Sequence, residues 1–204
     1  MTLAQWLDET LSPRARLAVL AAGVLLLLAP WFPLWRITMY AGQFPEGLRL
    51  SIYSYKLVGG NAGADLQGIN ILNHYIGMRE LQAADFVEMR FIPFALGVFF
   101  LLVLRSTVFA KLRDLVDVTV LFLYFSAFSF GVFWYRMYTY GHDLSPEAPI
   151  KIAPFTPPLI GHQKLANFDV YSAPGLGSVL LMAFALGLIG VLVLEARRLR
   201  LRRP

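Results

Sequence analysis

Four long runs of apolar residues dominate the sequence, at about residues 17–36, 89–108, 115–136 and 176–195. A helix of about 20 apolar residues crosses the ~30 Å hydrocarbon core of a bilayer, so each run can provide one crossing. Charged residues make up only 15% of the chain, whereas soluble domains carry about 25%. The sequence therefore predicts an all-α membrane protein with four transmembrane helices, a single membrane domain over residues 1–204 in contact with the lipid bilayer.

Positive charge is concentrated beside the ends of these runs. Ten of the 18 Lys and Arg residues lie in the N-terminal tail, the short link between the second and third runs, and the C-terminal tail. The other eight are spread, with eight acidic residues, over two long loops at about residues 37–88 and 137–175. Because short basic segments stay in the cytoplasm, we expect both termini there and both loops outside. Nucleic acid is not expected as a partner, since the excess charge follows the membrane ends.

The two loops are too long to be simple connectors, and we expect them to fold together into a small mixed cap. In the first loop, apolar and polar residues alternate after Leu48 as far as Val58, which predicts a strand. Apolar residues then recur at helical spacing, which predicts a helix with Asp65 as its N-cap. The second loop contains six prolines, including Pro157-Pro158, and is expected to lie as an extended strap across the first.

All three histidines lie in these loops, and one of them has a methionine at helical spacing. His74 and Met78 are four residues apart, so a continuous helix would place both on one face. Imidazole and thioether ligands suit copper, Cu(I) in particular. We therefore hypothesise a copper site built from His74, Met78, His142 and His162. The alternative is that these side chains only form hydrogen bonds or pack, as loop histidines usually do.

Other kinds of site find little support in the sequence. The chain has no cysteine, which excludes disulfides, thiolate metal sites and covalent haem attachment. No histidine lies in an apolar run, which argues against a haem held between the helices. No serine has nucleophile-elbow spacing, and the His-Glu-x-x-His zinc motif is absent. No catalytic residue is assigned, and a role other than that of an enzyme is favoured.

The two loops contain the segments Phe44-Pro45-Glu46-Gly47-Leu48, Asn73-His74-Tyr75-Ile76-Gly77-Met78 and Pro154-Phe155-Thr156-Pro157-Pro158. These three segments resemble an uncharacterised family of bacterial inner-membrane proteins. Proteins of this family accompany copper or nitrous-oxide-reductase maturation systems and related respiratory chains. The resemblance covers both loops and assigns no site residue. It implies a multi-pass protein of the bacterial cytoplasmic (inner) membrane, with an accessory role in assembly, metal delivery or complex stabilisation.

Three functional hypotheses follow. The first is an accessory or scaffold protein of a bacterial respiratory or metal-handling system, which contacts other membrane or periplasmic proteins through its loops. The second is a copper-binding protein for cuproenzyme maturation, with its site on the periplasmic face. The third is a transporter or a lipid-active enzyme, which is disfavoured because neither a nucleophile nor a charge relay within the membrane is apparent. The sequence does not separate the first two.

Overall fold

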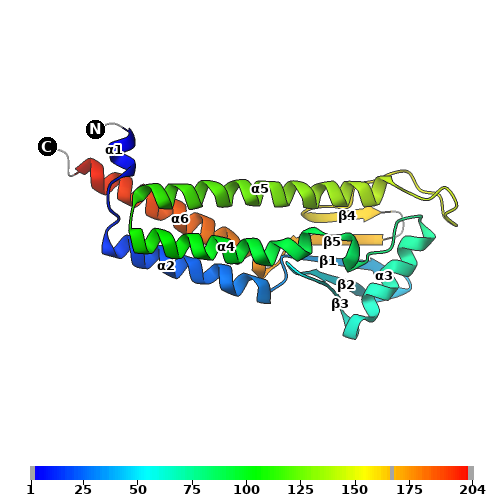
Figure 1. Cartoon of the computed structure of the whole chain (residues 1–204). Coiled ribbons are helices and arrows are strands. Elements are labelled where there is room, and N and C mark those ends of the chain that lie inside the picture. Colours follow the sequence, from blue (N-terminus) through cyan, green and yellow to red (C-terminus); the bar gives the residue numbers. More distant parts are fainter. Residues whose placement is uncertain (1–2, 166–167, 202–204) are drawn as a thin grey trace.

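The computed structural model describes residues 3–165 and 168–201 as an elongated molecule, with a helical bundle at one end and a sheet at the other (Figure 1). The first and last described residues both lie at the bundle end. Four helices are long and apolar enough to cross a membrane, which confirms that prediction. The first consists of α2 (Pro13–Leu28) and the turn that continues it to Trp31. The others are α4 (Glu88–Phe109), α5 (Leu112–His142) and α6 (Leu176–Leu201), and a short helix, α1 (Leu3–Leu7), precedes all four.

The first membrane helix begins and ends on clear local signals. Ser12 caps α2, because its hydroxyl accepts a hydrogen bond from the Ala15 N–H (3.2 Å), and Pro13 occupies the first turn. A 3₁₀ turn, η1 (Ala29–Trp31), follows the helix, and the prolines in this region prevent the helix from continuing. The helix therefore ends before the apolar run does, and Trp35 already belongs to a strand.

The four long helices form a bundle in which α2 and α5 each pack against both α4 and α6. A cluster of phenylalanines lies in its core. Phe122 of α5 meets Phe184 of α6 edge to face, with ring centroids 4.7 Å apart, and Phe99 of α4 meets Phe122 at 5.2 Å. At the end near the termini, the buried carboxylate of Glu195 accepts hydrogen bonds from the backbone N–H and the hydroxyl of Ser12. These bonds join the start of α2 to α6.

A five-stranded antiparallel sheet stands at the other end of the molecule, in the strand order β3-β2-β1-β5-β4. Three strands come from the loop after α2, and two come from the loop before α6. The all-α class is therefore not confirmed, because the cap, which was expected to be mixed, contains a whole sheet. The pairing of β1 with β5 joins segments that are far apart in the chain, so no local pattern predicts it. The strands are β1 (Trp35–Ala41), β2 (Phe44–Ile52), β3 (Leu57–Gly59), β4 (Gly161–Leu165) and β5 (Phe168–Pro174).

The predicted strand over residues 48–58 is a hairpin. After β2, the chain turns back with a hydrogen bond from the Tyr53 N–H to the Lys56 carbonyl (2.9 Å), and β3 pairs with β2. The second loop is extended, as predicted, only over residues 143–160, which we call the strap. The last part of the second loop, after the strap, forms β4 and β5, where side chains alternate between the two faces of the sheet.

The inner face of the sheet is apolar and is covered by two helices (Figure 1). Trp35, Ile37 and Val170 point inward and share a core with Ile69 and Leu72 of α3 (Ala64–Tyr75). The last turns of α5 lie over the same face. At 31 residues, α5 is about 46 Å long and extends well beyond the ~30 Å core of a membrane. Short 3₁₀ turns, η2 (Asn61–Gly63) and η3 (Ala83–Asp85), precede α3 and α4.

The helix predicted in the first loop is α3, but Asp65 is not its N-cap. Gly63 occupies that position, and Asp65 lies in the first turn. Its buried carboxylate accepts hydrogen bonds from the Arg49 N–H (2.9 Å) and the Asn61 side-chain amide (2.7 Å). Asp65 therefore fixes the start of α3 against β2, and this orients α3 across the inner face of the sheet.

Candidate functional site

A large cavity, with a volume of about 1200 Å³, lies between the inner face of the sheet and the membrane helices. Sites for drug-sized ligands typically enclose ~300–1,000 Å³, so this one can hold a larger molecule. Its walls come from the sheet, from α3, α4, α5 and α6, and from the strap. Nearly all of the lining side chains are apolar. Among the described residues of the wall, the charged ones are Glu88, Arg136 and Lys164.

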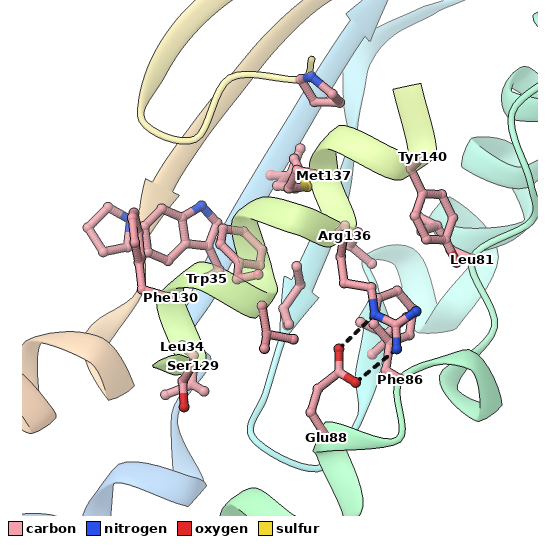
Figure 2. A pocket seen from close by; sticks show the side chains of 18 of the residues that line it. Leu34, Trp35, Leu81, Phe86, Glu88, Ser129, Phe130, Arg136, Met137 and Tyr140 are labelled. Atoms are coloured by element: carbon pink, nitrogen blue, oxygen red, sulfur yellow. Dashed lines mark hydrogen bonds and ion pairs between the residues drawn. The ribbon is translucent and has the colours of Figure 1, made fainter. Parts of the chain in front are cut away.

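Trp35, the first residue of the central strand β1, is part of the sheet wall. Its ring centroid lies 5.0 Å from that of Phe133 and 6.4 Å from that of Phe130, both on α5. Its indole N–H donates to the Ser172 hydroxyl (2.8 Å), and the Leu159 carbonyl lies 3.1 Å away. Because the polar atom of the indole is satisfied within the protein, the ring offers the cavity an apolar surface. Figure 2 shows Trp35 and Phe130 together on one side of α5.

An ion pair stands on the other side of α5 (Figure 2). Arg136 of α5 donates from Nε and Nη2 to the two carboxylate oxygens of Glu88, each at 3.1 Å. Glu88 lies in the first turn of α4, where the helix dipole favours a negative charge. The side chains are 33% and 26% exposed, respectively, so the pair is partly shielded from solvent. A bidentate interaction of this kind fixes the orientation of the guanidinium as well as its position.

Two aromatic rings support this ion pair. The Arg136 guanidinium lies over the Phe86 ring at 5.7 Å from its centroid, and Phe86 stacks on Tyr140 at 5.9 Å. Tyr140 lies in the last turn of α5, and its hydroxyl is 3.5 Å from the Glu80 carbonyl. Burial, and then the nearby charge of Asp85, raise the pKa of Tyr140. Like any tyrosine, it is protonated at neutral pH, and its hydroxyl can donate a hydrogen bond there.

The cavity is not confined to the cap. Its lining includes Phe125 and Ser129 of α5 and Leu181 of α6, which lie in the apolar membrane helices. Lining side chains at its edges are open to the surroundings, since Phe91 of α4 is 63% exposed and Met182 of α6 is 52% exposed. Exposed apolar side chains of membrane helices face lipid. The cavity therefore connects the interior of the cap with the hydrocarbon region beside the bundle.

The structure does not place His74 and Met78 on one helical face, as the copper hypothesis requires. Helix α3 ends at Tyr75 because Gly77 adopts a left-handed conformation (φ +79°). The Met78 N–H then bonds back to the Asn73 carbonyl (2.8 Å), which closes the end of the helix. His74 is exposed on the surface of α3, whereas Met78 lines the cavity.

The other two histidines lie elsewhere in the cap. His142 ends α5, where its ring stacks on Tyr138 at 3.8 Å and its Nδ1 lies 2.9 Å from the Tyr138 carbonyl. His162 lies on β4, with Nε2 2.8 Å from the Asp169 carboxylate, and its ring stacks on the neighbouring tyrosine of β5. The register places His162 on the outer face of the sheet, and α3 covers the inner face. The sheet therefore separates His162 from His74.

Within residues 3–165 and 168–201, no three His, Asp or Glu side chains gather as they would at a metal site. The structure also brings neither Met78 nor His162 onto the surface that carries His74. Copper binding through these residues therefore stays a prediction without a structural contact behind it.

The chain matches no protein-family model, and neither a curated protein nor a solved structure is significantly similar to it. Its function is therefore inferred from the cavity and the residues around it.

The sequence alone does not single out Glu88, Arg136 or Trp35. The two charged residues stand at the ends of apolar runs. In the sequence they are only two of the basic and acidic residues that balance one another in the outer loops. The sequence does contain a signal that could predict this ion pair, because opposite charges at the same end of neighbouring membrane helices tend to pair. Trp35 carries no such signal, since its place in the wall depends on the pairing of β1 with β5.

Proposed function

We propose that this protein is an accessory membrane protein that holds the acyl chain of a membrane lipid in the cavity between cap and bundle. The observation that supports the proposal is the cavity itself, about 1200 Å³ in volume, lined by apolar side chains and open toward the membrane helices. Apolar surface is stabilised by ~25 cal/mol for each Å² removed from water, so a water-filled cavity of this kind is unfavourable. An acyl chain from the adjoining bilayer removes that surface from water.

The chemistry of the wall favours holding a ligand over transforming it. Apart from the charged side chains, the described wall offers hydroxyl and amide groups, such as those of Ser129, Tyr140 and Asn73. It has no histidine that would activate one of those hydroxyls as a nucleophile. In the orientation that the charge distribution favours, the cap and the cavity lie on the outer face of the cytoplasmic membrane. The lipid then comes from the outer leaflet, between the exposed edges of α4, α5 and α6.

Photolabelling by a lipid tests this proposal. The protein is reconstituted into phosphatidylcholine vesicles that contain a phosphatidylcholine with a photoreactive diazirine near the end of one acyl chain. Lipid that only surrounds the bundle labels the outward faces of the membrane helices. An acyl chain held in the cavity also labels the part of the cavity wall that the cap forms, at Leu50 of β2 and at Ile69 and Leu72 of α3. Peptide mapping by mass spectrometry identifies the labelled residues.

A matched pair of variants ties that labelling to the cavity. Ser129 lines the cavity, whereas Ala127 on the same helix is exposed and does not. Ser129→Trp fills part of the space and is expected to reduce labelling of the cap peptides several-fold, while Ala127→Trp leaves it unchanged. Equal labelling in both variants, or cap peptides that remain unlabelled in the unaltered protein, would contradict the proposal.

A further inference from the structure

The proposed lipid site contains one strongly polar contact, and that contact indicates which part of the lipid it meets. We infer that Arg136, held in place by Glu88, donates hydrogen bonds to the ester carbonyl at the head of a glycerolipid's acyl chain. The inference rests on the proposed function, and it adds a ligand class: a chain linked through an acyl ester. Arg136 is then a binding residue, and Glu88 positions it.

Arg136 has unused donors at the cavity wall. A guanidinium carries five N–H groups, and the two bonds to Glu88 use two of them. The remaining three have no acceptor among the described residues, although the side chain is only one-third exposed. The Nη1 atom, which carries two of these three N–H groups, is not fully buried, and Arg136 lines the cavity, so a hydrogen-bond partner can reach them from there. In a cavity whose wall is otherwise mainly apolar, the oxygen of a bound ligand supplies that partner.

Charge decides what kind of oxygen is suitable. Arg136 is already neutralised by Glu88, and the carboxylate of Asp85 acts on it as well. A ligand with a carboxylate at the head of its chain would add a second negative charge beside Glu88, in surroundings that screen charge poorly. An uncharged carbonyl accepts from the free N–H groups without that repulsion. The site therefore favours an acyl ester over a free fatty acid.

The position of Arg136 along the membrane normal agrees with an acyl ester as the ligand. The ion pair stands at the first turn of α4, where the chain passes from the cap into the apolar helix. Membrane lipids place their ester groups at the same level, between the hydrocarbon core and the headgroups. From there, one acyl chain of the lipid can extend past Met137 into the cap part of the cavity, and the other can extend along Ser129 and Phe125 into the bundle part.

The geometry also limits the movement of the guanidinium. The two parallel bonds to Glu88 and the contact with the Phe86 ring hold its plane, and Phe86 is itself stacked on Tyr140. A donor that is held in place before binding loses little freedom when the ligand arrives. A hydrogen bond from such a charged donor changes affinity by about tenfold or more.

Two lipids that differ only in the carbonyl provide the test. Diacyl phosphatidylcholine and its dialkyl-ether analogue have the same headgroup and chain length, but the ether lipid has no ester carbonyl. The purified protein is exchanged into an equimolar mixture of the two, and native mass spectrometry counts each lipid that remains bound. We expect the ester lipid to be enriched about tenfold over the ether lipid. Equal retention of the two lipids overturns the inference, and this comparison needs no variant.

Variants then assign the preference to Arg136. The double variant Arg136→Met/Glu88→Met removes both charges together and is expected to abolish the ester preference by lowering retention of the ester lipid to that of the ether lipid. The matched control, Arg79→Met/Asp143→Met, removes an exposed ion pair that does not line the cavity and should keep the preference. A preference that persists without Arg136 overturns the inference.

The two proposals fail in different ways. If neither lipid is retained beyond the level of the Ser129→Trp variant, the lipid site itself is wrong. If lipid is retained without an ester preference, only the role of Arg136 is wrong. A third mixture, in which palmitic acid competes with its methyl ester, checks the charge argument. Tighter binding of the acid would show that an anionic head is preferred and would overturn the choice of an ester.

Discussion

Replacing Gly141 by alanine tests how the strap closes the cavity. Gly141 lies in the last turn of α5, and its carbonyl accepts a hydrogen bond from the Phe155 N–H of the strap (3.0 Å). A Cβ atom at position 141 would lie 1.9 Å from the Phe155 carbonyl oxygen and 3.2 Å from Cδ of Pro157. Both strap residues line the cavity. The added methyl group therefore pushes the strap away from α5 and opens this part of the wall.

The size of the effect follows from three contributions. Forcing a methyl group into a packed contact costs about 1–3 kcal/mol. Weakening the hydrogen bond to the strap costs a further ~0.5–1.5 kcal/mol. The better helix propensity of alanine offsets about 1 kcal/mol. Gly141→Ala should therefore lower the free energy of unfolding by about 1–3 kcal/mol, which lowers Tm by roughly 3–10 °C for a chain of this size.

The assay is thermal unfolding of purified protein in one detergent, with Gly131→Ala as the control. Gly131 lies on the same helix, and a Cβ added there meets nothing within 4 Å. In this control only the helix propensity acts, so Tm should stay the same or rise by roughly 2–4 °C. Equal shifts in the two variants, or a rise in Tm for Gly141→Ala, would show that the strap does not pack on α5 as described.

Two further predictions concern the bundle and its orientation. Glu195 is 4% exposed and pairs with Arg198 (2.8 Å) as well as with Ser12, so Glu195→Ala leaves a shielded cation unpaired and should cost about 3 kcal/mol or more. A Tm shift no larger than that of the exposed control, Glu147→Ala, would contradict this role. Because the chain has no cysteine, single cysteines report topology: Glu147→Cys should react with an impermeant thiol reagent in intact spheroplasts, and Lys111→Cys should not. The reverse pattern would overturn the proposed orientation.

Hydropathy and periodicity along the chain are sufficient to predict part of this structure. The four membrane helices and α3 are predicted from the sequence because their signals are local: about 20 apolar residues in a row, or apolar residues recurring at helical spacing. The strap is predicted for a similar reason, since prolines such as Pro157-Pro158 prevent both helix formation and central strand pairing.

Strand pairing and the cavity depend on contacts between distant segments. Trp35 is apolar and lies near the end of an apolar run, so the local sequence is equally compatible with the end of a helix and with a buried strand. It becomes part of the cavity wall because β1 pairs with β5, a segment more than a hundred residues away. The end of α3 shows the same limit at short range. His74 and Met78 have helical spacing, but the left-handed Gly77 between them ends the helix.

The ion pair of Glu88 and Arg136 shows most clearly what sequence patterns leave open. In the sequence the two residues are unremarkable charges at the ends of two apolar runs. They meet because α4 begins, and α5 leaves the bundle, at the same level, and because α5 is long enough to continue over the sheet. Charge and hydropathy are properties of single residues and can be read along the chain. The partner of a charge, and the space that several elements enclose, are properties of the folded arrangement and exist only once distant segments have packed.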